Sequence, residues 1–332
     1  MEDTPLISIA LCTYNGERFL REQLDSLLAQ DYLNLEIVAV DDASTDGTPA
    51  ILEAYAARDP RLRVFHNASN LGFRRNFQEA IERCRGDFIA PADQDDVWRP
   101  DKLRLLLKAI GDAAAAYCDS ELIDEQGRPL GLTVSDKRVM GPIHDPLILA
   151  LQNCVSGHAM LLRRSLAARA MPVPEGLYHD WWLALVAAGE GGIAYCPQPL
   201  VQYRQHGRSV TDIAGLRRAA RPRGQGLAKF EAAEQRLLAC AAFTSSGNHA
   251  LVEELLLLWQ ARREQYLCPR LALFALRHRH RLFSQYRNER KRRARYALGL
   301  LWGLRLKRLF SPRAYGLPSP EAGRGTPGRA GA

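Results

Sequence analysis

The chain has 332 residues, of which 47% are hydrophobic and 25% are charged, and its formal net charge is +8. This composition is ordinary for a globular protein, and the length allows one large domain and a smaller one. The seven cysteines are scattered and form no CxxC pair, which argues against a disulfide framework or a zinc site and for a reducing compartment. Because we see no signal peptide and no run of roughly 20 apolar residues, we expect a cytoplasmic protein without a membrane-spanning helix.

Short apolar segments alternate with helical patterns over the first 110 residues. Four predicted strands cover residues 6–12, 36–40, 62–65 and 87–90. Four predicted helices follow them, beginning near Glu17, Thr48, Phe73 and Pro100. Regular alternation of this kind predicts an α/β fold with a parallel, doubly wound sheet.

Beyond residue 115 the alternation is less regular. Further strands are predicted at 115–118, 156–162 and 193–196, with a hairpin turn at 124–128, a helix from Tyr178 to about Ala188 and an outgoing segment at 201–207. A linker rich in Arg, Gly and Pro covers 217–226. Nearly all of 229–310 has a helical pattern, and the Pro- and Gly-rich tail from Ser311 is expected to be disordered.

Polar side chains follow three of the predicted strands at their carboxyl ends. They lie at Thr13–Asn15, at Asp41 and Asp42, and at Asp93–Asp96. Three carboxylates in the last cluster would repel one another unless a cation lay among them, and oxygen ligands suit Mg²⁺ or Mn²⁺, which bind phosphate oxygens. The alternative is an acidic loop that caps the helix after Pro100. Independent capping loops would have no reason to share one sheet edge, so the pattern favours a nucleotide-type site.

Three segments, at 8–15, 40–48 and 93–98, resemble the motifs of family 2 glycosyltransferases, which have the GT-A fold. The run 93–98 is similar to the rhamnosyltransferase-like branch, which builds bacterial surface polysaccharides such as O-antigen. The resemblance covers about residues 5–210, and three motifs in the right order make it specific. A dinucleotide-binding dehydrogenase would carry GxGxxG after its first strand, and neither that motif nor a P-loop is present.

The resemblance implies a donor site for a nucleotide sugar with a UDP or dTDP carrier. The implied donor-binding residues are Thr13, Tyr14, Asn15, Glu17, Asp41, Asp42, Arg75, Asp93 and Gln94. Asp42 would accept a hydrogen bond from a pyrimidine N3–H while Thr13 and Tyr14 help to hold the base and ribose. Asp41 would mainly shape the turn. Arg75 would touch the diphosphate, although a solvated helix face explains it equally well.

The same resemblance implies a Mg²⁺ or Mn²⁺ ion held by Asp93, Asp95, Asp96 and His206. Asp93 and Asp95 match the DxD motif, with Asp95 as a direct ligand and Asp93 reaching ribose or a metal-bound water. The ion would bridge the diphosphate and neutralise the charge that develops as the sugar leaves. His206 matches a late histidine that many such enzymes direct at the metal or diphosphate, and a structural role is its alternative.

A separate acid is needed as general base, because a carboxylate that holds a metal does not readily accept a proton. The family places this base in an acidic pair, usually Glu-Asp, and here Asp180 matches the second member while His179 replaces the first. Asp180 would take the proton of an acceptor hydroxyl that attacks the anomeric carbon from the opposite face, so that one step inverts configuration. The alternative is that Asp180 only caps its helix.

The acceptor pocket is implied by two further pairs of residues. Gly157 and His158 lie where the family lines this pocket. Trp181 and Trp182 could offer a face for stacking on a sugar, but adjacent aromatic residues on a helix point in different directions. At least one of the two tryptophans is therefore expected in the core.

Two dense cationic clusters, at 277–281 and 290–295, are interleaved with Leu, Phe, Tyr and Trp. This mixture suits a helix that lies in a membrane interface, where anionic headgroups attract cations. Such a location would fit a lipid-linked acceptor. The alternatives are a helical subdomain or oligomer contact and a nucleic-acid patch, and no nucleic-acid motif accompanies the charge.

We therefore expect a GT-A catalytic domain at 1–215, a basic helical domain at 216–310 and a disordered tail at 311–332. Residues 1–112 would bind the nucleotide sugar, and 113–215 would form the acceptor and catalytic half. The predicted reaction moves a sugar such as rhamnose to a saccharide or lipid-linked saccharide, with inversion and a metal ion. Two other classes stay open. One is a nucleotidyltransferase, although its Gly-rich loop and basic signature are missing after the first strand, and the other is a catalytically idle, membrane-associated scaffold.

Overall fold

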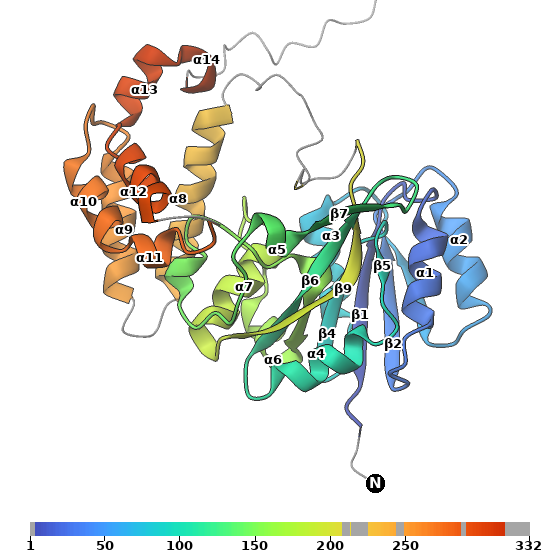
Figure 1. Cartoon of the computed structure of the whole chain (residues 1–332). Coiled ribbons are helices and arrows are strands. Elements are labelled where there is room, and N and C mark those ends of the chain that lie inside the picture. The colour runs from blue at the N-terminus through green and yellow to red at the C-terminus, as the bar shows by residue number, and fades with distance from the viewer. Residues whose placement is uncertain (1–3, 208–212, 214–224, 244–248, 287–289, 316–332) are drawn as a thin grey trace, which may run out of the picture.

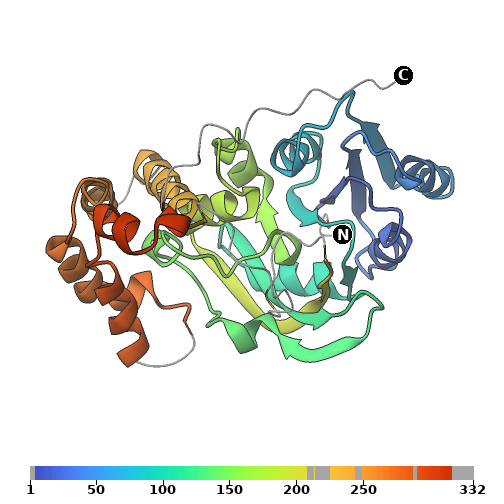
Figure 2. The same ribbon diagram turned by 90° about the horizontal axis from the view of Figure 1, so that it is seen from above.

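The computed structural model describes residues 4–207, 213, 225–243, 249–286 and 290–315. One mixed β-sheet lies at the centre of the chain's first 207 residues, with helices on both of its faces (Figure 1). A group of helices from the C-terminal third of the chain lies beside this sheet. Seen from above, that group and the helices of the N-terminal half lie at opposite ends of the molecule (Figure 2).

The N-terminal half forms the parallel sheet that the sequence predicts. Its strands are β1 (Ile7–Thr13), β2 (Leu35–Asp41), β3 (Leu62–His66) and β4 (Phe88–Ala92), and its helices are α1 (Leu20–Leu28), α2 (Thr48–Ala56) and α3 (Phe73–Glu82). The strands lie in the order β3-β2-β1-β4 and pair in parallel. Every residue of β1 and β2 is buried, as expected for apolar strands covered by helices on both faces.

The second half of the sheet is mixed. Its strands are β5 (Val97–Trp98), β6 (Ala115–Ile123), β7 (Pro129–Thr133), β8 (Met160–Arg163) and β9 (Ile193–Arg204). Its helices are α4 (Lys102–Ile110), α5 (Val134–Lys137), α6 (Arg164–Ala170) and α7 (His179–Glu190), with short 3-10 helices at Pro146–Ile148 and Gly157–Ala159. β8 runs antiparallel to both β4 and β6, whereas β9 runs parallel to β6.

Two predicted elements differ from the structure in this half. The strand expected at 156–162 begins only at Met160, because Gly157–Ala159 forms a 3-10 turn. The separate segments expected at 193–196 and 201–207 belong to one strand, β9. Its pairing with β6 shifts register next to Cys118 and Asp119, opposite Cys196 and Pro199. This irregularity accommodates a proline, which cannot donate to the ladder, inside a long strand.

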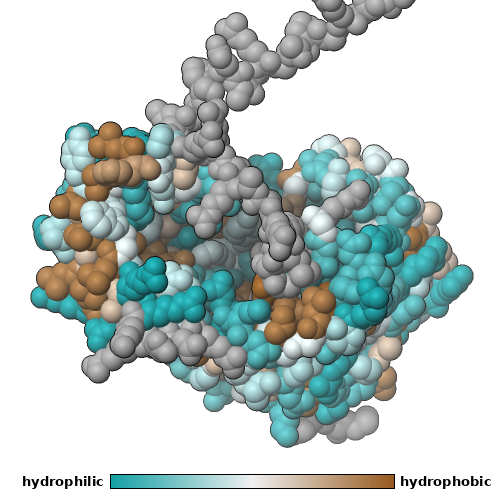
Figure 3. All heavy atoms as spheres, turned by 45° about the horizontal axis from the view of Figure 1, so that its top comes forward, coloured by the Kyte–Doolittle hydropathy of each residue, from teal (hydrophilic) through white to brown (hydrophobic). Residues whose placement is uncertain are grey.

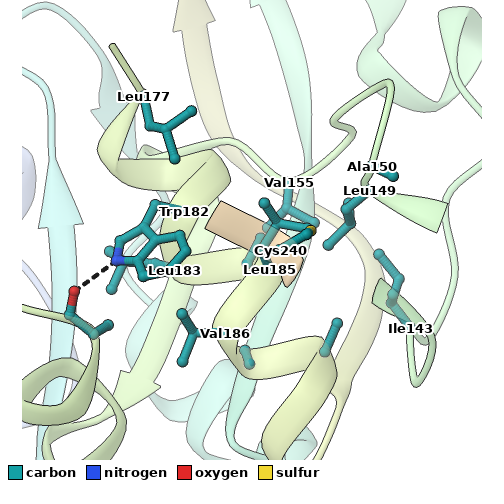
Figure 4. Close-up of a cluster of buried hydrophobic side chains, with 14 of the residues drawn as sticks. Ile143, Leu149, Ala150, Val155, Leu177, Trp182, Leu183, Leu185, Val186 and Cys240 are labelled. Carbon is teal, nitrogen blue, oxygen red and sulfur yellow. Dashed lines mark hydrogen bonds between the residues drawn. The ribbon is translucent and has the colours of Figure 1, made fainter. Parts of the chain in front are cut away.

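The core lies on both faces of the sheet. One cluster packs α1, α2 and α4 against it through residues such as Leu24, Leu52 and Leu106. The other packs α3, α6 and α7 against the opposite face and continues into the C-terminal helices. Figure 4 shows part of this second cluster, where Trp182 of α7 donates its indole N–H to the Ala170 carbonyl at 2.6 Å.

The C-terminal helices are α8 (Gln225–Phe243), α9 (His249–Ala261), α10 (Pro269–Arg277), α11 (Arg279–Leu282), α12 (Arg290–Gly299), α13 (Leu304–Phe310) and α14 (Pro312–Tyr315). Most of the predicted linker at 217–226 lies outside the described residues. The tail is expected to be disordered from Ser311, but Pro312–Tyr315 forms α14, and the rest of the tail lies outside the described residues. Within the described part of the chain, no helix is both long enough and apolar enough to cross a membrane.

Candidate active site

The register of the parallel strands brings the polar clusters together. Thr13 at the end of β1 pairs with Asp41 at the end of β2, and Leu11 pairs with Ala92 at the end of β4. The segments that follow, at 13–17, 42–48 and 93–96, therefore leave the sheet at one edge. This edge is where open α/β sheets bind ligands.

The first two of these segments are joined by hydrogen bonds. Thr13 Oγ1 donates to Asp41 Oδ1 at 2.8 Å, and Asp41 also accepts from the Ser44 backbone and hydroxyl. Asn15, at φ 47°, donates its N–H to Ser44 Oγ, and Glu17 accepts from the Gly47 N–H. The sequence placed Thr13, Asn15, Glu17 and Asp41 near a donor, and in the structure their polar atoms fix the shape of the loops.

Asp42 holds a different loop. Its carboxylate accepts from the N–H groups of Leu71 and Gly72 at 2.8 and 2.9 Å, and from the Asn67 amide at 2.8 Å. Its side chain is buried. Asp42 thus anchors the turn before α3, and only the remaining lone pairs of its carboxylate are left for a nucleobase.

Tyr14 presents an open aromatic face beside this edge. Its side chain is 47% exposed, and its backbone N–H and carbonyl are paired with the Gln94 side-chain amide at 2.8 and 3.0 Å. Gln94 therefore ties the loop after β1 to the acidic loop after β4. The Asp93 carbonyl is held in turn by the Gln23 amide at 2.9 Å.

Within the described residues, Asp93, Asp96 and His158 offer three ligand atoms that lie within 4.8 Å of one another. His158 Nδ1 lies 3.7 Å from Asp93 Oδ2 and 3.4 Å from Asp96 Oδ2. Asp96 is fully buried, and its Oδ2 has no hydrogen-bond partner, whereas its Oδ1 accepts from the Arg204 N–H. Burial and the charges of Asp95 and Asp93 raise the pKa of Asp96 well above its ordinary value. Carboxylate and imidazole donors with an orphaned buried oxygen fit a divalent cation.

Two residues that the sequence analysis missed support His158. Ser120 Oγ lies 3.1 Å from His158 Nε2, and the buried Lys102 ammonium donates to the His158 carbonyl at 2.6 Å. Lys102 Nζ also lies over the Trp98 ring, and burial lowers the pKa of this lysine well below its ordinary value. Helical spacing could have found Lys102, because it lies one turn before Leu106 on the buried stripe of α4.

Asp95 faces a different histidine. Its Oδ2 lies 2.7 Å from His206 Nε2, which places the predicted DxD ligand and the predicted late histidine in contact. The backbone carbonyl of Asp95 accepts from Arg204, a buried arginine that also pairs with Glu22 at 2.5 Å. Nothing in the local sequence pattern separates Arg204 from a solvated arginine, so the sequence alone does not mark it as a site residue.

Asp180 lies in the first turn of α7, beside the 3-10 turn of Gly157. A Cβ at Gly157 would lie 3.4 Å from Asp180 Cβ and 2.9 Å from His179 Nε2, so only glycine allows this approach. Loss of hydration and the charge of Asp93 together raise the pKa of Asp180 to about 7. The hydrogen bond from the Trp181 N–H acts in the opposite direction but is outweighed. A carboxyl with that pKa can exchange a proton near neutral pH.

His179 is buried next to Asp180 without a polar partner. It stacks on Phe77 at a centroid distance of 3.7 Å, and neither ring nitrogen has a hydrogen-bond partner among the described residues. Burial lowers its pKa to about 4, so the imidazole is neutral at pH 7. The position before Asp180 is therefore uncharged, unlike the first member of the acidic pair that the family resemblance implies.

The remaining predicted site residues are spread more widely. Trp182 is in the core, whereas Trp181 donates its indole N–H to the Leu149 carbonyl and lies under the Arg236 guanidinium of α8 at 3.8 Å. Arg75 lies 3.9 Å from Glu175, so its side chain is directed at the loop before α7. That loop also carries Tyr178, whose exposed ring stacks on the exposed Phe73 at 5.5 Å.

Comparisons with known proteins agree with this geometry. The family model for Glycosyl transferase family 2 matches residues 8–169. TuaG of Bacillus subtilis, a glycosyltransferase assigned to teichuronic acid biosynthesis, is 32% identical over 214 residues, which cover 62% of this chain and 82% of TuaG. The chain belongs to glycosyl transferase family 2. An uncharacterized glycosyltransferase of Haemophilus influenzae is 27% identical to this family 2 glycosyltransferase over 228 residues, which cover 64% of this chain and 69% of that protein.

Solved structures show the same fold. The S. aureus TarS 1–349 complex with UDP-GlcNAc matches with a TM-score of 0.57 at 19% identity, covering 92% of this chain and 84% of TarS 1–349. A Pyrobaculum calidifontis mannosyltransferase in complex with GDP-Man and Mn²⁺ matches with a TM-score of 0.52 at 18% identity, covering 90% and 75%. At these identities the likeness concerns the fold alone, which is a GT-A-type mixed α/β sheet followed by C-terminal helices.

Proposed function

We propose that this family 2 glycosyltransferase moves a sugar from a nucleoside diphosphate to a hydroxyl of a saccharide or lipid-linked saccharide in surface-polysaccharide synthesis, with inversion. The observation that carries the proposal is Asp180, a carboxyl with a pKa of about 7 next to the acidic edge of a nucleotide-type sheet. The teichuronic acid assignment of TuaG supports the polysaccharide pathway. The UDP-GlcNAc and GDP-Man in the two similar structures support the donor class.

In the proposed reaction Asp180 acts as general base. It accepts the proton of an acceptor hydroxyl as that oxygen forms the new bond to the anomeric carbon. The bond between the anomeric carbon and the diphosphate oxygen breaks at the same time, and the nucleoside diphosphate leaves with the electron pair. Because attack and departure occur on opposite faces, a single displacement inverts the anomeric configuration.

The donor would lie along the edge formed by the 13–17, 42–48 and 93–96 segments. The exposed ring of Tyr14 is free to stack on the base, and the lone pairs that Asp42 retains can accept from it. The loops around Asn15, Glu17 and Gln94 are already fixed by hydrogen bonds, so little entropy is lost when they bind a nucleotide.

A Mg²⁺ or Mn²⁺ ion fits two neighbouring sets of donors. One set is Asp95 and His206, which are both partly exposed, and the other is Asp93, Asp96 and His158, of which only Asp93 is exposed. We propose that the Asp95 set, together with Asp93, holds the ion at the diphosphate, while Asp96 and His158 orient Asp93 from behind. The ion would supply charge neutralisation for the leaving diphosphate.

The acceptor would approach from the side of α7. Gly157 lies against Asp180, and Trp181 follows it in the chain, whereas the buried His158 and Trp182 would act from behind the pocket. The exposed, stacked rings of Phe73 and Tyr178 lie next to this point and offer the apolar face that a sugar ring needs.

The test is a transfer assay with a donor panel that includes dTDP-rhamnose, UDP-hexoses and GDP-mannose, and with saccharide and lipid-linked acceptors. Wild-type protein should release nucleoside diphosphate from one donor and give a product of inverted configuration by NMR. Asp180→Asn should bind that donor but not transfer its sugar, whereas Asp112→Asn, a change at an exposed carboxyl, should behave as wild type. Normal turnover by Asp180→Asn would remove the proposed base.

A further inference from the structure

The C-terminal helices expose an unusual combination of side chains. Between Gln265 and Tyr315 there are 14 Lys or Arg residues and a single Asp or Glu. The same region exposes large apolar side chains, among them Leu267, Leu273, Leu298, Trp302, Leu309 and Phe310. Hydrophobic and hydrophilic residues lie side by side over this part of the molecule in Figure 3, where it forms the left lobe.

Backbone contacts between two segments hold the side chains of Leu267 and Trp302 toward solvent. Leu267 and Trp302 face each other in an antiparallel bridge, flanked by hydrogen bonds from Gly303 N–H to the Tyr266 carbonyl and from Cys268 N–H to the Leu301 carbonyl. A Cβ at Gly303 would overlap the Gln265 carbonyl, so glycine is what allows the two segments to touch. Opposed residues of an antiparallel pair project to the same face. Leu267 and Trp302 are 51% and 47% exposed there.

Cations flank this pair on the neighbouring elements. Arg270 and Arg277 are exposed on α10 with Leu273 between them at helical spacing, so one face of α10 carries two charges and a leucine. Arg305, at the start of α13, lies 5.9 Å from the Tyr266 ring and pairs with Glu264 at 2.5 Å, so Arg270 and Arg277 are the cations on which the argument rests. Further along α13, Leu309 and Phe310 are 67% and 80% exposed.

We infer that this basic apolar surface, formed by the 266–277 and 302–310 segments, docks on an anionic lipid surface. The charge excess complements anionic headgroups, and the exposed Leu, Phe and Trp side chains match the apolar layer beneath them. A nucleic acid would pair with the arginines through its phosphates, but the apolar side chains of Leu267, Leu309 and Phe310 would then face a charged backbone. This inference goes beyond the transfer reaction and does not depend on it.

The probe is the full-length protein sedimented with vesicles of phosphatidylcholine, with or without phosphatidylglycerol. Binding should require phosphatidylglycerol and weaken with added salt. Arg270→Gln and Arg277→Gln should each reduce binding about fivefold, and the double variant about 25-fold, at ~1 kcal/mol per cation. Arg58→Gln, a change at an exposed arginine of the catalytic domain, is the matched control and should bind as wild type.

The apolar contribution has its own test. Leu309→Gln with Phe310→Gln should lower vesicle binding at least tenfold, since burying each such side chain stabilises by about 1.5–3 kcal/mol. Leu33→Gln, at a leucine exposed far from this surface, should have no effect. Of the five tryptophans, Trp302 is the one with a large exposed area, so brominated lipid should quench wild-type fluorescence and leave Trp302→Phe unaffected.

Three results of the vesicle assays would overturn the inference. They are equal binding to neutral and anionic vesicles, unquenched Trp302 in sedimented protein, or sedimentation unchanged by the arginine and α13 variants. Tight binding to RNA that anionic vesicles do not displace would assign the surface to nucleic acid instead. None of these assays contains a nucleotide sugar, so their failure would leave the proposed transfer reaction untouched.

Discussion

The ionisation of Asp180 should set the pH at which transfer begins. Its pKa of about 7 means that about one carboxyl in ten is ionised at pH 6 and about nine in ten at pH 8. A general base acts only when it is ionised, so kcat/KM should rise about tenfold over this interval. Part of the raised pKa comes from the charge of Asp93, so a cation bound at that carboxylate should lower the pKa of Asp180. If the cation binds together with the donor, the rise in the pH profile of kcat, which reports the substrate complex, should lie at lower pH than the rise in kcat/KM, which reports the free enzyme.

Asp180→Asn provides the perturbation. It should lower kcat by about 10²–10⁴-fold, the usual contribution of a general base, without changing donor affinity. The folded pKa lies above the ~3.9 of an unfolded chain, so the folded protein binds more protons between these values and loses stability as pH rises through them. The Asn variant should therefore have a higher Tm than wild type at pH 8 and a similar Tm at pH 4.

The assay is release of nucleoside diphosphate under kcat/KM conditions across this pH range, with Tm measured in the same buffers. Asp112→Asn controls for the loss of one carboxylate at the surface. A flat profile across neutral pH, or an Asp180→Asn variant with normal kcat, would refute the assignment of Asp180 as base. A lower Tm for the variant at pH 8 would refute the argument that its ionisation opposes folding.

Three further predictions concern stability. Between pH 7 and pH 5 the wild type should lose about 2 kcal/mol of unfolding free energy, because His179 binds a proton in the unfolded chain but, with a folded pKa of about 4, not in the folded one. His179→Phe should remove this loss. Urea unfolding at both pH values measures it, and an equal loss in the variant would contradict the prediction. Trp182→Ala should destabilise by about 3–5 kcal/mol through the cavity it leaves under α7, and a change below ~1 kcal/mol would show that this core is not tightly packed. Arg204→Met should destabilise the fold by about 1–3 kcal/mol for each backbone carbonyl left without a donor, and it should weaken donor binding because it frees the Asp95 carbonyl. Unchanged calorimetric affinity would separate Arg204 from the site.

The sequence predicted the parallel half of the fold because each of its strands is short, apolar and followed by a polar turn. The same regularity predicted that the polar clusters share one sheet edge, since the carboxyl ends of parallel strands lie at the same edge of a sheet. The sequence also located Asp180 in the first turn of a helix, which the structure bears out for α7.

Contacts between distant segments were beyond the sequence. His158 lies against Asp96 only because β8 inserts between β4 and β6, and no local pattern encodes that strand order. Arg204 is buried because three backbone carbonyls and Glu22 converge on it from distant parts of the chain. Lys102 was also missed, but it could have been found from the sequence, because helical spacing alone places it on a buried stripe.

Calorimetric binding of UDP, dTDP and GDP, and of their sugars, with Mn²⁺, Mg²⁺ or EDTA tests the metal-dependent donor site most directly. We expect that one nucleoside diphosphate binds only with metal, and that Asp95→Asn abolishes this binding while Asp112→Asn preserves it. Absence of binding by demonstrably folded wild-type protein, or metal-dependent binding that survives in Asp95→Asn, would rule out a metal-dependent donor site at Asp95.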